Sequence, residues 1–381
     1  MKFGIYGREF KSLVDRIGGI VPKRTALPTL ETVKISAHDN MVEFQATDMT
    51  DYATIITYAN VYEDGAVWVY LSDLKKALAI TDDLTITAEH GKLDIRSAKK
   101  SYEIPCHDDY EDTWATFPVI DNNNILCRQM DNEFLKHLSV IDCARSTESS
   151  NMIMTGFYLD LINQKLVALD GYRIGIAKLH GMFVPNSPSL ILNGSVYTCL
   201  KSLIGKSKEK YIEIYADKKH VKFVGEDFEY ISRLMDGNYF DYKKLVEPAI
   251  ENSEYTYKVN PKELFKISKE YSKVISSDNK LPMIIYNVNG SVATGVQVQN
   301  YRTSDVLESV ECEHGMSHEW HVGVNPRFIV DACAAFKDEA EIKGNYNYKN
   351  PIMLIDETYE FLILPVNIND VDVEFVKRQV A

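Results

Sequence analysis

The residues best suited to holding a metal ion lie in one short segment, ECEHGMSHEWH, which contains Cys312, His314, His318 and His321. Histidines four residues apart, such as His314 and His318, can share a metal ion when their segment is helical. The glycine in this segment and the HVGV run after it instead favour a loop that enters a strand. We therefore expect no metal site, and an enzyme on an unrelated α+β fold that uses these residues stays as the alternative from another functional class.

Other patterns that could support catalysis are incomplete. The GKS triplet at 205–207 matches the end of a phosphate-binding loop, but Leu200 stands where that loop requires glycine, and the triplet follows an expected helix rather than a strand. The acidic pairs at 82–83 and 108–109 lie in turn-like contexts and are interpreted as solvated loop charges. No GxSxG motif occurs. The sequence thus predicts no catalytic residue, no cofactor and no enzymatic activity.

A more informative pattern is a stripe of lysines at helical spacing in the last third of the chain. Its members are Lys262, Lys266, Lys269 and Lys273. Because Leu264, Ile267 and Tyr271 recur on the opposite side, this helix can pack on a sheet and present its lysines outward. A solvated helix face without a ligand is the simplest interpretation of such a stripe.

Basic residues recur on the other expected helices, and this recurrence favours a functional surface. The set comprises Arg8, Lys11, Arg16, Lys75, Lys76, Lys136 and Lys201. The chain carries a formal net charge of −13, which argues against a protein that coats DNA by general attraction. A basic lining within an acidic protein would contact phosphates without reading bases, so we expect salt-sensitive, sequence-independent contact with double-stranded DNA.

These helices belong to a pattern that is written three times, starting near Phe10, Phe134 and Leu264. A second helix is expected later in each copy, within YLSDLKKALAI, LNGSVYTCLKSLIG and VNPRFIVDACAAF. The expected helix caps are Asp131 and Asn260 for first helices, and Ser72, Asn193 and Asn325 for second helices. Alternating segments such as VKISAHDNMVEFQAT and LTITAEHGKLDIRS predict antiparallel hairpins around the helices.

The predicted fold class is therefore α+β, with three tandem domains of two helices packed on antiparallel sheets. The expected domains are residues 1–122, 123–250 and 251–381, with joints at FPVIDNNN and EPAIENSE. The sequence has no run of eighteen apolar residues and no signal-peptide pattern, so no membrane association is expected. Its six cysteines form no CxxC pair. We expect reduced thiols and a cytoplasmic location.

Several strings, in order along the chain, resemble the bacterial sliding clamp, the beta subunit of DNA polymerase III. They are KRTALPTLETVKI from Lys23, ATDMTDY from Ala46, VALDGYRIGIAKL from Val167, ISRLMDGNYFDYKKLVEP from Ile231 and FLILPVNI from Phe361. The resemblance implies a head-to-tail homodimer, a closed ring whose helices line a hole for DNA. Such a ring is a non-catalytic processivity factor that a separate ATP-driven loader places on DNA and that tethers the polymerase.

The resemblance also implies three sets of site residues. Arg24 matches a position on the DNA-facing surface. Tyr102, Ile104, Val274 and Ile275 match the contact between protomers, although all four could equally be core residues. Linear peptides of the polymerase and the clamp loader would dock in a pocket between the second and third domains. The matching pocket positions are Met154, Leu169, Gly171, Tyr172, Arg173, Ile174, Phe240, Lys244, Leu245, Leu281, Asn325, Phe328, Leu364, Pro365, Val366 and Asn367.

Departures from the family pattern bear on partner choice. Leu169 replaces a small or hydroxyl residue, Phe240 replaces a proline, and Asn367 replaces a frequent arginine. The chain also continues past Ile368, where the family usually ends, as a tail at 369–381 that could cover the pocket, extend it or hang free. These departures leave a divergent clamp of a mobile element or accessory polymerase as one alternative, and a monomeric interaction scaffold is a separate one. Without the resemblance, LDGYR is typical of a polar hairpin turn with a capped charge.

Overall fold

The computed structural model describes residues 1–79, 81–123, 125–204, 210–275, 281–288, 290–298, 301–308, 310–314 and 318–368. The chain forms two compact units. Unit 1 comprises Met1–Lys136 and His180–Asp236, and unit 2 comprises His137–Leu179 and Gly237–Ala381. Within the described residues, no helix is long and apolar enough to cross a membrane.

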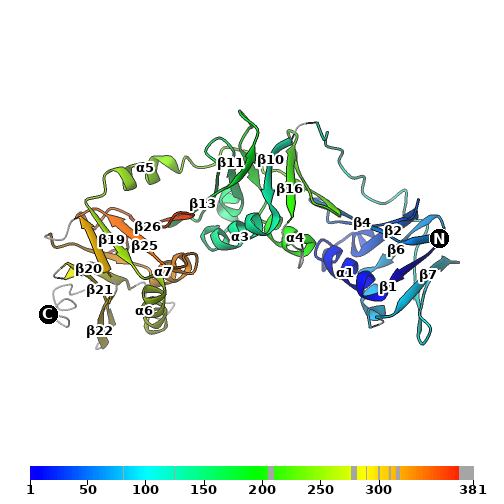
Figure 1. Cartoon of the computed structure of the whole chain (residues 1–381), viewed down its shortest axis with the longest axis horizontal. Helices are drawn as coiled ribbons and strands as arrows, with labels where there is room; N and C mark the ends of the chain where they lie inside the picture. The colour runs from blue at the N-terminus through cyan, green and yellow to red at the C-terminus, as the bar shows by residue number, and fades with distance from the viewer. Residues whose placement is uncertain are drawn as a thin grey trace. The chain divides into compact units, whose positions relative to one another are not determined.

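The same order of elements recurs three times along the chain (Figure 1). The first copy contains β1 (Lys2–Tyr6), α1 (Gly7–Ile17), η1 (Pro28–Glu31), β2 (Thr32–His38), β3 (Met41–Thr47), β4 (Asp51–Tyr58), β5 (Asn60–Glu63), β6 (Gly65–Tyr70), α2 (Leu71–Leu74), η2 (Lys75–Ala77), β7 (Asp83–Glu89), β8 (Lys92–Arg96) and β9 (Ser101–Pro105). The second contains β10 (Ile125–Met130), α3 (Asp131–Ile141), η3 (Asp142–Ala144), η4 (Ser149–Thr155), β11 (Phe157–Asp160), β12 (Lys165–Leu169), β13 (Arg173–Lys178), β14 (Gly181–Phe183), β15 (Leu190–Leu192), α4 (Ser195–Ile204), β16 (Tyr211–Ala216), β17 (His220–Val224) and β18 (Phe228–Arg233).

The third copy follows an extra helix, α5 (Lys243–Glu251). It contains β19 (Tyr255–Val259), α6 (Pro261–Val274), β20 (Met283–Val288), β21 (Ser291–Val298), β22 (Tyr301–Val306), β23 (Val310–His314), β24 (His321–Val324), α7 (Pro326–Cys333), β25 (Ala340–Gly344), β26 (Ile352–Ile355) and β27 (Tyr359–Ile363). All six helices expected from the repeat are present, which confirms the mixed helix and antiparallel-sheet fold class.

Unit 1 is built on a sheet that runs through two copies of the repeat, in the order β14-β10-β16-β17-β18-β4-β3-β2-β6. The connection is the antiparallel pair β18 and β4, in register from Phe228 opposite Ile55 to Ser232 opposite Asp51. A second sheet, β5-β1-β7-β8-β9, completes the unit. Backbone hydrogen bonds thus make the first copy and much of the second one body.

Unit 2 repeats this arrangement with the next pair of copies. Strands β11-β12-β13-β27-β26-β25-β19-β23 follow one another in one sheet, and the connection is β13 with β27, from Arg173 opposite Ile363 to Ala177 opposite Tyr359. The remaining strands form the sheet β22-β21-β20-β24. The middle copy contributes strands to both connections. The boundaries of the two compact units therefore do not coincide with the expected domain boundaries. The three-domain division at 122 and 250 stays a prediction.

Local sequence explains most individual elements. Helix α1 buries Phe10, Leu13, Val14 and Ile17, as its apolar spacing predicted. The hairpin of β2 and β3 turns through Asp39 and Asn40, whose φ angles are 48° and 58°, a conformation that Asn and Asp tolerate in tight turns.

The expected helix caps were right in part. The side chains of Asn260 and Asn325 accept from the N–H of Lys262 (2.9 Å) and Arg327 (3.0 Å), and Asn193 accepts from Ser195 (3.2 Å). Ser72 was wrong as a cap, since β6 runs directly into α2 and Tyr70 occupies the N-cap position without a side-chain bond. Asp131 is itself the first residue of α3 rather than its cap.

The two expected joints differ. In EPAIENSE, the residues up to Glu251 belong to α5, including Pro248, and its role as a joint between domains stays a prediction. That helix is held by burial, with Tyr242 and Val246 packed against Ile176 and Leu362 of the sheet of unit 2. FPVIDNNN has no helix or strand among its described residues, and the buried Lys222 Nζ donates to the Ile120 carbonyl at 3.0 Å.

Candidate functional site

The lysine stripe lies on the exposed face of α6. Asn260 caps this helix, and its other side is buried through Leu264, Ser268 and Tyr271. Lys262, Lys266, Lys269 and Lys273 are all exposed. The Lys262 Nζ lies 3.5 Å from the Asp338 carboxylate, so one lysine has an acidic neighbour. The structure therefore leaves this face open to a phosphate backbone, and the DNA contact itself stays a prediction.

The other predicted DNA contacts are exposed as well. They are Arg24, Lys11, Lys75, Lys76, Lys136 and Lys201. Lys11 lies 2.5 Å from Asp15 and Lys76 lies 2.6 Å from Asp73, each an acidic neighbour within one helical turn. Exposed pairs of this kind are weak, so they reduce the local positive charge without fixing the lysine.

Arg16, which was also expected on the basic surface, has a different role. Its guanidinium makes two hydrogen bonds to the Asp227 carboxylate, at 2.6 and 2.7 Å, and its Nε donates to the Leu203 carbonyl at 2.7 Å. The sequence did not reveal these partners because they come from α4 and the turn before β18, nearly two hundred residues or more away. Arg16 fastens α1 to them with three of the five N–H groups of its guanidinium.

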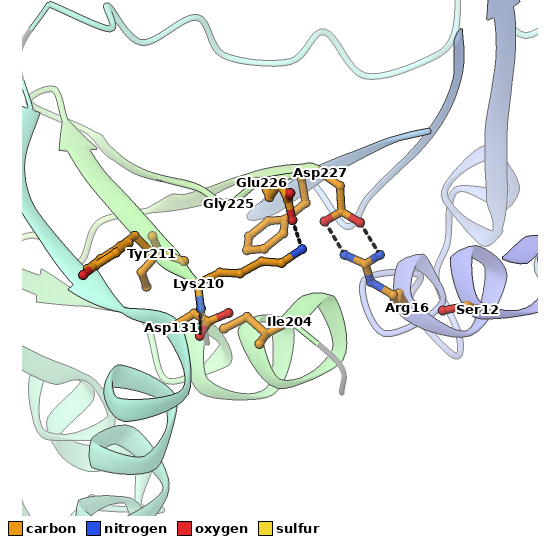
Figure 2. A pocket seen from close by; sticks show the side chains of 11 residues that line it. Ser12, Arg16, Asp131, Ile204, Lys210, Tyr211, Gly225, Glu226 and Asp227 are labelled. Carbon is orange, nitrogen blue, oxygen red and sulfur yellow. Dashed lines mark hydrogen bonds and ion pairs between the residues drawn. The ribbon is translucent and has the colours of Figure 1, made fainter. Parts of the chain in front are cut away.

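Arg16 lines a polar pocket of unit 1 (Figure 2). The lining residues are Ser12, Arg16, Asp131, Ile204, Lys210, Tyr211, Ile212, Gly225, Glu226, Asp227 and Phe228. Figure 2 shows Arg16 turned toward Asp227 and Lys210 toward Glu226, and both pairs are within ion-pair distance. The cations of this pocket are thus paired with carboxylates that the chain itself supplies.

Unit 2 carries an apolar pocket at the place where the predicted peptide site was expected. Met154, Leu169, Gly171, Arg173, Ile174, Phe240, Leu245, Leu362 and Leu364 line it. Leu169 (3% exposed) and Leu362 (1% exposed) form its buried wall, whereas Phe240 (44% exposed) lies at its mouth. All of these residues belong to unit 2, so the pocket forms within one compact body.

The pocket contains only part of the predicted set. Tyr172, Lys244, Leu281, Asn325, Phe328, Pro365, Val366 and Asn367 are absent from its lining. Tyr172 is 66% exposed at the hairpin tip, and Lys244 is paired with Asp241 at 3.3 Å. Leu362 was missed, although strand alternation places it on the same face of the chain as Leu364, two residues later.

The LDGYR segment is a hairpin turn between β12 and β13, as its polar composition alone suggested. Asp170 Oδ1 accepts from the N–H groups of Tyr172 and Arg173, each at 3.0 Å. Gly171 has φ of +87°, which favours glycine, while a Cβ there would meet no atom within 4 Å. The side chain of Asp170 therefore orders the backbone of the turn. The residues before and after it, Leu169 and Arg173, both line the pocket.

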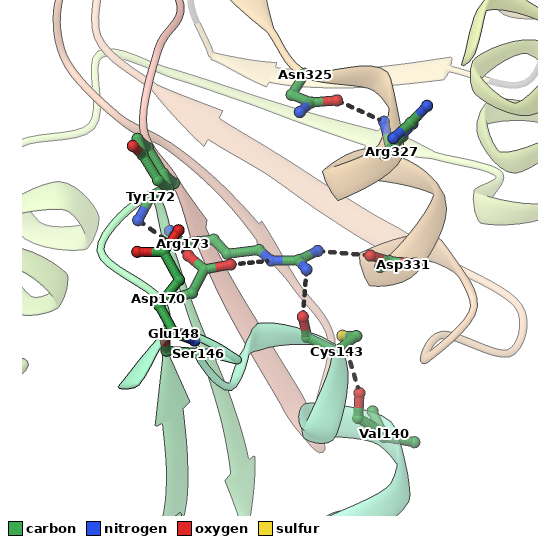
Figure 3. A network of polar contacts seen from close by, with 10 residues as sticks. All are labelled: Val140, Cys143, Ser146, Glu148, Asp170, Tyr172, Arg173, Asn325, Arg327 and Asp331. Atoms are coloured by element: carbon green, nitrogen blue, oxygen red, sulfur yellow. Dashed lines mark hydrogen bonds and ion pairs between the residues drawn. The ribbon is translucent and has the colours of Figure 1, made fainter. Parts of the chain in front are cut away.

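Arg173 lies at the centre of a polar network beside the pocket (Figure 3). Its Nε donates to Asp170 Oδ2 at 3.0 Å, one terminal nitrogen donates to Asp331 Oδ2 at 2.6 Å, and the other donates to the Cys143 carbonyl. The guanidinium also lies 4.3 Å from the centroid of the Phe328 ring. Burial opposes the charge, but the hydrogen bond to Asp331 and the nearby carboxylates raise the pKa of Arg173 overall.

The residues matched to the protomer contact occupy two places. Tyr102 and Ile104 are on β9, the last strand of its sheet, and Ile104 is only 7% exposed. Val274 ends α6, and Ile275 after it is 8% exposed. Ile104 and Ile275 are thus largely buried within the single chain, while Tyr102 and Val274 are half-buried.

The histidine segment is mostly strand. Val310–His314 forms β23, which pairs with β19, so the expected loop was wrong for this part, while HVGV forms β24 as expected. His318 stacks on Tyr346 at 4.8 Å and His321 on Tyr348 at 5.6 Å. Among the residues with described side chains, no group of three or more His, Cys, Asp or Glu could hold a metal ion. The GKS triplet and the tail at 369–381 lie outside the described residues.

Comparison with known proteins gives a consistent result. The family model of the DNA polymerase III beta subunit, N-terminal domain, matches residues 1–113. The beta sliding clamp of Chlamydia pneumoniae is 25% identical, covering 97% of this chain and 100% of its own, and that of Bacillus subtilis is 23% identical, covering 96% and 99%. The crystal structure of the Bacillus subtilis clamp superposes with a TM-score of 0.85 at 21% identity over 96% of this chain and 99% of its own. The resemblance is confirmed over nearly the whole chain.

Proposed function

We propose that this chain is a DNA sliding clamp, a head-to-tail homodimer that encircles duplex DNA and tethers a polymerase and other DNA-processing proteins. The clamp is not an enzyme, and it takes no cofactor. A separate ATP-driven loader opens and places it. Its place of action is the cytoplasm, where bacterial DNA is replicated.

The observation that carries this proposal is the exposed lysine face of α6 on an otherwise acidic chain. Lysines on a rigid helix attract phosphates without reading base edges, so the contact has no sequence preference. Weak contact suits a sliding protein, because a tight grip on each phosphate would slow its movement. Retention then comes from closure of the ring rather than from affinity.

The apolar pocket supports the tethering part of the proposal. A groove with buried aliphatic walls and an open aromatic mouth suits a short linear peptide with apolar side chains. Peptides of the polymerase and of the loader would occupy it in turn. Because a tethered partner stays at a high effective concentration, repeated rebinding becomes processive synthesis.

Ring closure is assigned to the edge strand β9 with Tyr102 and Ile104 on one protomer, and to Val274 and Ile275 of its partner. Pairing an edge strand also removes a site of nonspecific association. In a closed head-to-tail ring, each contact joins two different surfaces, one from each chain. The pair Tyr102 and Ile104 and the pair Val274 and Ile275 would supply these two surfaces.

The test is retention on circular DNA. After loading onto a nicked plasmid, the protein should stay bound through gel filtration and should be released when a restriction enzyme cuts the plasmid once. Solution mass should correspond to two chains. Equal retention on circular and linear DNA, or a single-chain mass with no retention, would favour the monomeric scaffold.

A narrower role as the clamp of a mobile element or accessory polymerase is favoured by the pocket itself. Leu169 forms part of the buried wall and Phe240 narrows the mouth, at positions where the family usually has smaller or different residues. Pull-down with the peptide of the host replicative polymerase separates the two roles. Firm binding of the host replicative polymerase peptide supports a role as the main host clamp. Weak binding of that peptide, together with firm binding of an accessory polymerase peptide, supports the narrower role.

A further inference from the structure

The junction of unit 1 contains a counterpart of the wall that lines the apolar pocket of unit 2. In unit 2, Asp170 Oδ1 accepts from the N–H groups two and three residues later. In unit 1, Asp48 Oδ1 accepts in the same way from Thr50 at 2.8 Å and from Asp51 at 2.7 Å. The two turns therefore correspond residue by residue, and Asp51 takes the place of Arg173.

This correspondence continues across the sheets. The next residue in unit 2, Ile174, pairs with Leu362, and both line the apolar pocket. The next residue in unit 1, Tyr52, pairs with Ile231. Directly paired residues of antiparallel strands project their side chains to the same face of the sheet. Tyr52 and Ile231 therefore form the counterpart of the pocket wall.

A segment of the same chain covers this counterpart. Residues 113–122, called the linker here, lie between the first and second copies of the repeat and contain no helix or strand. The Phe117 ring lies edge-on to the Tyr52 ring, with the centroids 5.2 Å apart. Ile120 is 6% exposed and packs with Ile231 in one hydrophobic cluster. The linker thus places an aromatic and an aliphatic side chain on this surface.

A buried lysine fastens the linker. Lys222 is 3% exposed and pairs with Ile231, so its side chain projects to the same face. Its Nζ donates to the Ile120 carbonyl at 3.0 Å and to Asn122 Oδ1. In unit 2 the corresponding place in the sheet is taken by Met353, whose side chain has no donor. The linker is therefore held by an amine that this place in unit 2 does not have.

We propose that this face of unit 1 is a second docking surface, which the chain keeps occupied with its own linker as an internal ligand. The ligand consists of an aromatic and a branched aliphatic side chain, together with a carbonyl that accepts from Lys222. Because the linker is covalently attached, its effective concentration is on the order of millimolar, so a dilute free peptide cannot displace it. The proposal goes beyond peptide docking in unit 2 and does not depend on it.

The first experiment empties the surface and supplies the linker as a separate peptide. The probe is an end-blocked, fluorescein-labelled peptide of residues 113–122, and fluorescence anisotropy follows its binding to the full-length protein. The Phe117→Ala, Ile120→Ala double variant should bind this peptide at least about tenfold more tightly than the parent protein, because its own linker no longer competes. A peptide with alanine at the same two positions should bind neither protein.

Two further variants locate the binding. Tyr52→Ala, added to the double variant, removes the ring that Phe117 contacts and should abolish the gain in affinity. Phe240→Ala, added instead, alters the apolar pocket of unit 2 and should leave the gain unchanged. Equal binding to the parent and the double variant, or a gain that Phe240→Ala removes, would overturn the proposal. Neither result would contradict peptide docking in unit 2.

A second measurement leaves the linker sequence intact. Lys222→Met removes the fastening amine and introduces the residue found at the corresponding place in unit 2. Thermolysin, which cuts before large apolar residues, should then cleave within residues 113–122 at least severalfold faster, because segments that detach are cleaved first. Lys218→Met, a matched change at an exposed lysine, should leave the rate as in the parent. An unchanged rate in Lys222→Met would overturn the proposal.

Discussion

The two units join consecutive copies of the repeat in the same way, yet they use the junction differently. In unit 1, β4 pairs with β18, and Arg16 binds Asp227 and the Leu203 carbonyl beside a polar pocket. In unit 2, β13 pairs with β27, and Arg173 binds two aspartates and a carbonyl beside an apolar pocket.

The difference lies in where the charges are placed. The pocket of unit 1 contains Arg16, Lys210 and their carboxylate partners, so both cations are paired within the pocket itself. In unit 2 the carboxylates that bind Arg173, Asp170 and Asp331, do not line the pocket. The pocket lining is therefore mostly aliphatic. The junction of unit 1 thus only holds two copies of the repeat together. The junction of unit 2 holds two copies together and also lies beside the proposed binding surface.

The largest expected effect is that of Arg173→Ala on stability. Removing a cation that is 10% exposed leaves Asp170, which is 17% exposed, without its partner, and breaking a buried pair costs about 3–5 kcal/mol. Urea unfolding followed by tryptophan fluorescence measures the change. Arg24→Ala, at an exposed arginine, is the control and should stay within about 0.5 kcal/mol of the parent. A cost below about 1 kcal/mol for Arg173→Ala would show that its network contributes little.

Arg16→Ala should cost less, which would sharpen the contrast between the junctions. Its partner Asp227 is 41% exposed and can be solvated once the arginine is gone, so we expect about 1–2 kcal/mol. The same unfolding experiment compares the two variants directly. If Arg16→Ala destabilised the chain as much as Arg173→Ala, burial would not be what distinguishes them.

Phe240→Ala should weaken peptide binding about tenfold, since an aromatic residue at the mouth of an apolar pocket is a typical hot spot. Fluorescence anisotropy with a fluorescein-labelled peptide of apolar side chains measures the loss. The matched change in the pocket of unit 1 is Tyr211→Ala, an aromatic that is 58% exposed. Comparable losses in both variants would contradict the assignment of peptide binding to unit 2 alone.

The smallest effect concerns Asp51, which lies in the junction of unit 1. Burial raises its pKa above 3.8, although the hydrogen bond from Tyr230 opposes the shift. The stability from this group is therefore fully present below the unfolded-state pKa and is lost as pH rises through the higher folded-state pKa. Asp51→Asn should make the protein more stable than the parent at neutral pH.

This advantage of Asp51→Asn should shrink as the pH falls, because the parent carboxyl then becomes protonated in the folded state. Urea unfolding at several pH values between neutral and mildly acidic conditions follows the difference. An advantage that grows on acidification would mean that the ionised carboxylate stabilises the junction.

Local sequence by itself determined the elements and their repetition. The apolar spacing from Phe10 to Ile17 and the lysine spacing from Lys262 to Lys273 each report one helix face, because side chains three and four residues apart share a face. The hairpins followed from alternation and turn residues for the same reason. The family resemblance then identified most of the residues that line the apolar pocket.

Tertiary structure alone decided how these elements are used. Nothing local predicts that β18 pairs with β4, that Arg16 meets Asp227 211 residues away, or that Arg173 meets Asp331 158 residues away. Helix α5 was missed because it depends on burial of Tyr242 and Val246 against a sheet assembled from distant strands. Arg16 and Arg173 are the same residue type in sequence. They differ in the carboxylates that folding brings to them, and this difference distinguishes the junction with a polar pocket from the junction with an apolar pocket.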